Sequence, residues 1–153
     1  VPGWKGRTMA PVNVRYIVQD VDAAIAFYRD LLGFDVEMHP APGFAMLSRD
    51  DLRLLLNTPR GGGGAGVPMP DGREPEPGGW NRIQILVDDI ERDVEGLRNS
   101  GARFRNEIVS GADVERLRSA GLTFRNDIIS GPGGQQILLD DPSGNPIELF
   151  QAH

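Results

Sequence analysis

The feature that most limits the fold is a pattern of elements that occurs twice along the chain. In each half, a β-rich segment ends at an aspartate and is followed at once by a segment of helical periodicity. The two aspartates are Asp20 and Asp89, which lie 69 residues apart. Short β-rich segments follow each helix, separated by turns rich in Gly, Pro or Asp. The repeat predicts an α+β fold of two β-α-β-β-β modules.

Both helices carry recognisable start and stop signals. The first is expected over 22–33, begun by an N-cap at Asp20 or Asp22 and ended by Gly33 in a left-handed conformation. The second is expected over 91–101. Apolar residues at three- and four-residue spacing mark the buried faces. These residues are Ile25, Tyr28 and Leu32 in the first helix and Ile90, Val94 and Leu97 in the second.

Gly and Pro concentrate between the two halves, over residues 57–81. A segment of this length and composition is typical of a linker or a long surface loop. The expected organisation is therefore one module over 12–58, a Gly/Pro-rich linker over 59–80 and a second module over 81–152.

A shorter repeat lies inside the second module. Residues 93–111 recur as 113–131, and 12 of the 19 aligned positions are identical. Each copy reads as one helix and one strand, which indicates a tandem duplication, natural or engineered. We expect the second copy's strand, 122–130, to hold the edge place of the sheet and the first copy's strand, 103–110, to be an added strand. In the alternative, the first copy holds the edge and the second is displaced or exchanged with a partner chain.

Two stretches resemble the vicinal oxygen chelate superfamily: VQDVDAAIAFYRDLLGF in the first half and LLDDPSGNPIELFQ near the end. That superfamily includes glyoxalase I, bleomycin-resistance proteins, extradiol dioxygenases, fosfomycin-resistance enzymes and methylmalonyl-CoA epimerase. The resemblance covers nearly the whole chain from about residue 12. It implies curved mixed β-sheets that form a cleft, helices on the outer face, and a homodimer. The fold carries many chemistries, so the function has to be argued from the site.

The resemblance also implies up to four metal ligands, which are His, Gln or Glu on the first and last strands of each module. The matching positions in this chain are Asn13, Arg82, Glu148 and either Arg53 or Leu55. Arginine cannot ligate a metal because its guanidinium stays protonated, and leucine has no donor atom. Only Glu148 matches the superfamily's ligand types, so we expect neither a metal nor another cofactor.

Period-two alternation places several polar side chains on the face of each sheet that points away from the helices. Arg82 and Glu148 share this face on neighbouring strands, so we expect an ion pair where a metal would lie, because a buried carboxylate needs a partner. The pair either only neutralises a buried cavity or also contacts a ligand. Trp80 could form an aromatic wall for a ligand or could pin the linker. The candidate ligand contacts are Asn13, Arg15, Trp80, Arg82, Gln84, Glu148 and Phe150; no catalytic residue is identified.

Composition limits the partners. The net charge of −6 and the isoelectric point near 4.9 disfavour nucleic acid and anionic membranes, and are compatible with a cationic ligand. The chain has no cysteine, which excludes disulfides and thiolate sites. No segment is apolar enough to span a bilayer, and the first residues lack a signal peptide's apolar core, so a cytoplasmic protein is expected.

These observations favour a metal-independent protein that binds a small cationic or aromatic molecule stoichiometrically, of the drug-sequestering, bleomycin-resistance type. One alternative is a glyoxalase-, epimerase- or dioxygenase-like enzyme with an atypical site. The other is a natural or engineered scaffold, altered by duplication, without activity of its own.

Overall fold

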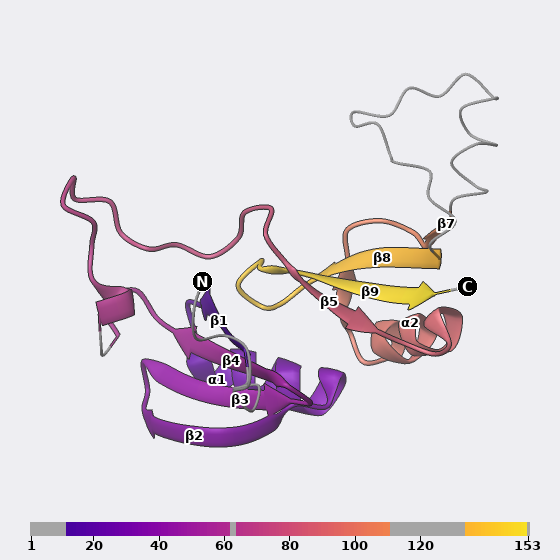
Figure 1. Cartoon of the computed structure of the whole chain (residues 1–153), viewed down its shortest axis with the longest axis horizontal. Coiled ribbons are helices and arrows are strands. Elements are labelled where there is room, and N and C mark those ends of the chain that lie inside the picture. The colour runs from indigo at the N-terminus through magenta and orange to yellow at the C-terminus, as the bar shows by residue number, and fades with distance from the viewer. Residues whose placement is uncertain (1–11, 62–63, 111–133, 153) are drawn as a thin grey trace, which may run out of the picture. The chain divides into compact units, whose positions relative to one another are not determined.

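A computed structural model describes residues 12–61, 64–110 and 134–152 (Figure 1). The chain divides between Gly78 and Gly79 into two compact units. Each unit has a mixed β-sheet and a helix that follows its first strand, so the fold class is α+β as predicted. Within the described residues, no helix is long and apolar enough to cross a membrane.

The first unit has a four-stranded sheet in the order β1-β4-β3-β2. Strand β1 runs parallel to β4, and the other pairs are antiparallel. The helix α1 contacts β3 and β4, whose leucines on that side are fully buried. The elements are β1 (Val12–Ile17), α1 (Val21–Ala26), the π-helical segment η1 (Phe27–Leu31), β2 (Asp35–Ala41), β3 (Phe44–Arg49), β4 (Leu52–Asn57) and the 3₁₀ turn η2 (Gly64–Gly66).

The first helix has the N-cap and the terminating glycine that the sequence predicts, although its helical residues run over 21–31. The Asp20 carboxylate accepts a hydrogen bond from the Ala23 N–H at 2.9 Å, which identifies Asp20 as the N-cap. Gly33 has φ +68°, the left-handed value expected at a helix end. The prediction of one continuous α-helix is wrong in its second part, which is π-helical. Ile25, Tyr28 and Leu32 are buried as predicted.

The second unit has a sheet in the order β5-β9-β8-β6, with β7 also pairing with β8. Strand β5 runs parallel to β9, and the remaining pairs are antiparallel. The Asp89 carboxylate caps α2 by accepting from the Arg92 N–H at 3.0 Å, and the predicted buried face of α2 is confirmed. The elements are β5 (Ile83–Leu86), α2 (Ile90–Asn99), β6 (Arg103–Phe104), β7 (Val109–Ser110), β8 (Gly134–Asp140) and β9 (Pro146–Ala152).

The place beside β8 is taken by the first copy of the internal repeat, so the expectation that strand 122–130 would hold it is wrong. Both β6 and β7, which come from the first copy, pair with β8. Gly101, with φ +87°, turns the chain directly after α2, so the first copy reaches β8 through a short connection. The second copy, 113–131, lies outside the described residues.

Side chains of the first copy also fix it to β8. Between β6 and β7, the Arg105 N–H donates to the Leu138 carbonyl at 2.7 Å, and the Leu138 N–H donates to Asn106 Oδ1 at 3.0 Å. The Arg105 guanidinium forms an ion pair with Asp140. The FRN sequence that makes these contacts is present in both copies, so sequence alone could not decide between them.

A tight turn leads into β9 and sets its register. The fully buried Asp141 carboxylate accepts from the Ser143 N–H at 2.9 Å, the Asn145 N–H at 2.8 Å and the Asn145 Nδ2 at 2.8 Å. Gly144 has φ +84°, a conformation that favours glycine. Because the turn is held by its own side chains, the strand that follows starts at a fixed residue.

Candidate functional site

The candidate site lies on the face of the second sheet that points away from its buried core. In β5, Ile83 and Ile85 are buried whereas Gln84 and Leu86 are exposed, which confirms the predicted alternation. Residues paired across strands point to the same side of a sheet. We call the side of the sheet that carries Gln84 and Leu86 the open face. Two rows of paired residues therefore cross the open face. They are Gln84–Glu148–Leu138 and Leu86–Phe150–Gln136.

Glu148 is the centre of a hydrogen-bonded network on the open face. Its Oε2 accepts from Arg82 Nε at 2.7 Å, and its Oε1 accepts from Gln84 Nε2 at 2.5 Å. The side chain of Glu148 is 8% exposed and that of Arg82 is 32% exposed. The predicted ion pair is therefore confirmed. Each carboxylate oxygen therefore accepts one hydrogen bond, Oε2 from the charged guanidinium and Oε1 from the neutral amide.

Local sequence explains why these three side chains meet. Strand β9 pairs in parallel with β5, which sets Glu148 directly opposite Gln84. Arg82 comes two residues before Gln84 and therefore points to the same side. A buried carboxylate needs donors, and the two neighbours provide them. No buried side-chain polar atom among the described residues lacks a hydrogen-bond partner.

The first unit shows which residue stands in the place equivalent to Glu148. Arg15 and Gln84 are related by the 69-residue offset between the modules. Arg15 pairs with Leu55, as Gln84 pairs with Glu148. Of the two residues that the sequence left open, Leu55 is therefore the structural equivalent, and Arg53 pairs with Asn13 instead.

The family model for the Glyoxalase/Bleomycin resistance protein/Dioxygenase superfamily matches residues 10–113. The chain belongs to this superfamily. No curated protein sequence matches the chain.

Solved structures of this superfamily share the fold with the present member. An antibiotic binding protein from Streptomyces sp. CB03234 is 21% identical, with 97% of this chain and 98% of that chain covered and a TM-score of 0.60. Lactoylglutathione lyase from Agrobacterium tumefaciens is 18% identical, with 94% of each chain covered and a TM-score of 0.60. A superfamily member from Sphaerobacter thermophilus is 20% identical, with 94% and 98% covered and a TM-score of 0.63. At these identities, the likeness establishes the fold alone.

The residues at the superfamily's metal positions do not suit a divalent ion in this member. They are Asn13, Leu55, Arg82 and Glu148. Leu55 has no donor atom and Arg82 brings a positive charge, which opposes metal binding. Both oxygens of Glu148 already accept hydrogen bonds. Within the part of the chain that the structure describes, no three or more His, Cys, Asp or Glu residues are grouped as a metal site.

The predicted contacts Asn13 and Arg15 belong to the first unit, whereas Arg82, Gln84, Glu148 and Phe150 lie together in the second. Arg15 donates through Nη1 to Asn57 Oδ1, and Asn13 is exposed. The sheet of the first unit also carries a separate polar cluster. In it, Ser48 Oγ donates to Glu37 Oε1 at 2.5 Å, and Arg53 Nη2 lies 3.9 Å from Glu37 Oε1.

Trp80 is 80% exposed, so it does not pin the segment before β5 as one interpretation held. Its role as an aromatic wall stays a prediction. Leu86, which is 68% exposed, was missed as a site residue, although its place in the alternating pattern of β5 was the available signal. It lies opposite Phe150, so the open face has an apolar row beside its polar one.

Part of the predicted linker forms a closed loop in the first unit. Arg60 forms an ion pair with Glu74, and its N–H donates to the Gly66 carbonyl at 2.8 Å. A Cβ added at Gly61 would overlap Thr58 Oγ1, so close packing requires glycine there.

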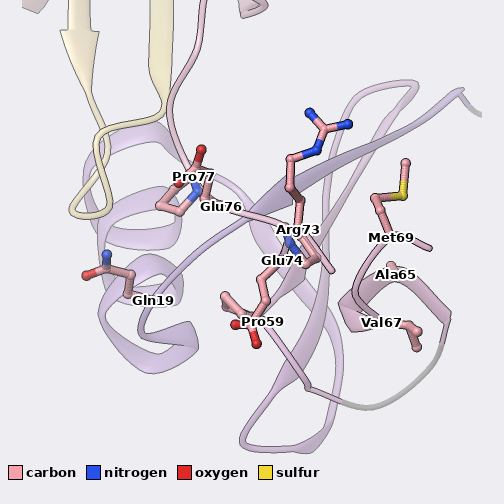
Figure 2. Close-up of a pocket in the computed structure, with 10 residues that line it drawn as sticks. Gln19, Pro59, Ala65, Val67, Met69, Arg73, Glu74, Glu76 and Pro77 are labelled. Carbon is pink, nitrogen blue, oxygen red and sulfur yellow. The ribbon is translucent and has the colours of Figure 1, made fainter. Parts of the chain in front are cut away.

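The loop surrounds a hollow of about 820 Å³ (Figure 2). Figure 2 shows Met69, Val67 and Arg73 on one side of the hollow, with Gln19 and Pro77 on another. The backbone N–H and then the guanidinium of Arg73 lower the pKa of the Asp71 carboxyl below its usual value. Arg73 pairs with Asp71 at the surface, and Arg60 likewise pairs with Glu74, so these four charged groups are engaged within the loop itself. The open face is the better candidate site.

Proposed function

We propose that this superfamily member binds a small organic molecule stoichiometrically on the open face of its second unit, without a metal centre. The network of Arg82, Gln84 and Glu148 carries this proposal. Arg82 and Glu148 lie where the family resemblance implies two metal ligands, and they form a closed ion pair instead. A site of this kind orients a ligand by hydrogen bonds and has no Lewis acid among its groups.

Apolar groups beside the network support a binding role. Leu86 and Phe150 lie directly opposite each other, and Leu138 lies opposite Glu148. Leu86 is largely exposed, and both Phe150 and Leu138 are half-buried. Small-molecule sites combine apolar walls with a few placed polar groups, as this face does. The antibiotic binding protein of the same fold supports drug sequestration as the form that this binding takes.

A thermal-shift screen tests the binding function. A ligand present at about 100 times its Kd stabilises the folded protein by about 2.7 kcal/mol, which raises Tm by roughly 5–11 °C at this size. We expect aromatic compounds with polar substituents to give such shifts. Substitution Arg82→Met should remove the shift, and the exposed control Arg92→Met on α2 should retain it. Shifts that Arg82→Met leaves unchanged would place the ligand elsewhere.

Measuring the metal content of the purified protein distinguishes a metal-free binding protein from a metal-dependent enzyme of this superfamily. We expect purified protein to carry a divalent ion at well below one equivalent. A stoichiometric ion that survives dialysis, together with turnover of a glyoxalase-type substrate, would replace the binding proposal by the enzyme alternative.

We also propose that the protein forms a homodimer, as the family resemblance implies. Every residue of β2 is exposed, including Val36 at 40% and Met38 at 46%, and β2 forms an edge of its sheet. Exposed apolar residues on an edge strand favour association. Light scattering on the eluting protein should give twice the mass of one chain, and a monomer mass would contradict the proposal.

A further inference from the structure

We infer that the ligand of the open face is a planar aromatic carboxylate, held by the outer edge of the Arg82 guanidinium. The inference rests on the proposed binding function and names the ligand class of that site. It replaces the cationic ligand that the acidic composition favoured. Three features of the network carry it: the burial of Glu148, the donors of Arg82 that Glu148 does not use, and the apolar row next to them.

The carboxylate of Glu148 is not available to a ligand. Its side chain is 8% exposed, and each oxygen accepts a hydrogen bond from a neighbouring side chain. A cation from solution would have to displace Arg82 or Gln84 to reach it. Displacement would leave the guanidinium without its charge partner, which is costly in a partly buried place. Glu148 therefore acts on the ligand only through Arg82.

The guanidinium of Arg82 is the group that a ligand meets. It uses Nε for Glu148, and within the described residues its Nη1 and Nη2 atoms have no protein partner. These two nitrogens present parallel N–H donors that match the two oxygens of a carboxylate. The side chain is 32% exposed, so this edge is within reach of solvent and is partly desolvated.

The apolar row lies at a suitable distance for a ring. The Arg82 guanidinium lies at the level of Glu148, to which it donates. The Leu86–Phe150 row lies two residues further along the strands, and two residues span about 7 Å. A bicyclic aromatic acid has similar dimensions between its carboxylate and its far ring. Its ring would lie on Leu86 and Phe150 while its carboxylate met Arg82.

Charge balance makes the inference testable. Arg82 and Glu148 together carry no net charge, so Glu148 limits the attraction of the guanidinium for an anion. Substitution Glu148→Gln keeps a group that can hydrogen-bond to Arg82 and Gln84 and removes the negative charge. The variant should bind an aromatic carboxylate more tightly. A site for cations would respond in the opposite direction.

The experiment is a calorimetric titration with three ligands of one shape: 2-naphthoate, 2-naphthamide and 2-naphthylmethylammonium. We expect 2-naphthoate to bind most tightly to the parent protein. In E148Q its affinity should rise roughly tenfold, the order expected when a like charge about 7 Å away is removed. R82M should abolish binding of 2-naphthoate, and R82K, which keeps the charge without the planar fork, should weaken it about tenfold. The control R92M should bind as the parent does.

Each other outcome overturns the inference. Tightest binding of the ammonium, weakened in E148Q, would show a cation site and leave the binding function intact. Equal binding of the amide and the carboxylate would show that the ligand's charge plays no part. If none of the three ligands binds, this inference fails, and the thermal-shift screen then decides on the binding function itself. Circular dichroism of each variant shows whether lost binding reflects lost folding, and R82K decides the question if R82M unfolds.

Discussion

Replacing Arg82 by methionine removes the charge partner of a carboxylate that is almost fully buried. Breaking a buried ion pair from one side costs about 3–5 kcal/mol in unfolding free energy. Two features of this site reduce that figure. Gln84 still donates to Glu148, and the Arg82 side chain is about one-third exposed. We therefore expect Arg82→Met to lower the unfolding free energy by about 2–3 kcal/mol.

A second substitution separates the contribution of the ion pair to stability from the other effects of replacing the Arg82 side chain. Changing Glu148 to methionine in the Arg82→Met variant removes the carboxylate that has lost its charge partner. It leaves two apolar side chains of similar volume in place of the ion pair. Such replacements of buried ion pairs are often neutral or stabilising. The double variant should therefore be within about 1 kcal/mol of the parent, and the coupling between the two sites should be about 2 kcal/mol.

Urea denaturation followed by circular dichroism measures both effects. With a slope of about 2 kcal/mol/M, the loss in Arg82→Met corresponds to a midpoint lower by about 1 M. Arg92→Met is the matched control, because Arg92 is 68% exposed in its pair with Asp93 and should cost no more than about 1 kcal/mol. A loss in Arg82→Met no larger than that of the control, or a double variant as unstable as Arg82→Met, would show that the ion pair does not stabilise the fold in this way.

Three further predictions concern a turn, a helix cap and a closely packed loop. Asp141→Ala should lower the unfolding free energy by roughly 2–4 kcal/mol, because two buried donors of Asn145 and one partly buried donor of Ser143 lose their acceptor, and an unchanged urea midpoint would contradict this. Asp20→Ala removes the N-cap of α1 and should cost about 1 kcal/mol, whereas Asp20→Asn should cost much less in the same measurement. Gly61→Ala should open the loop over 59–77 and speed its cleavage by a protease, while ligand binding on the open face is retained. Equal cleavage rates in the variant and the parent would show that the loop does not need this close packing.

The sequence carried enough information to predict the helices and the ion pair. Asp20 and Asp89 are short side chains directly before apolar residues of helical spacing, and a cap acts within three residues. The pair of Arg82 and Glu148 followed from strand alternation together with the family's strand order. Both predictions depend on short-range geometry or on a known topology, so they needed no knowledge of packing.

The edge of the second sheet depended on a choice that the sequence left open. Both copies of the internal repeat contain the FRN motif that fixes the strand to β8. Their local signals are therefore nearly equal, and only the strand pairing shows that the first copy lies beside β8. Arg53 and Leu55 posed a similar question of register, which only the pairing of β1 with β4 resolves.

Metal titration of the metal-stripped protein shows whether the open face holds an ion pair or a metal centre. We expect Zn²⁺, Mn²⁺ and Ni²⁺ to show no one-to-one binding that depends on Glu148, so the parent and E148Q should give the same weak isotherms. Binding of one equivalent to the parent protein that is lost in E148Q would contradict the account.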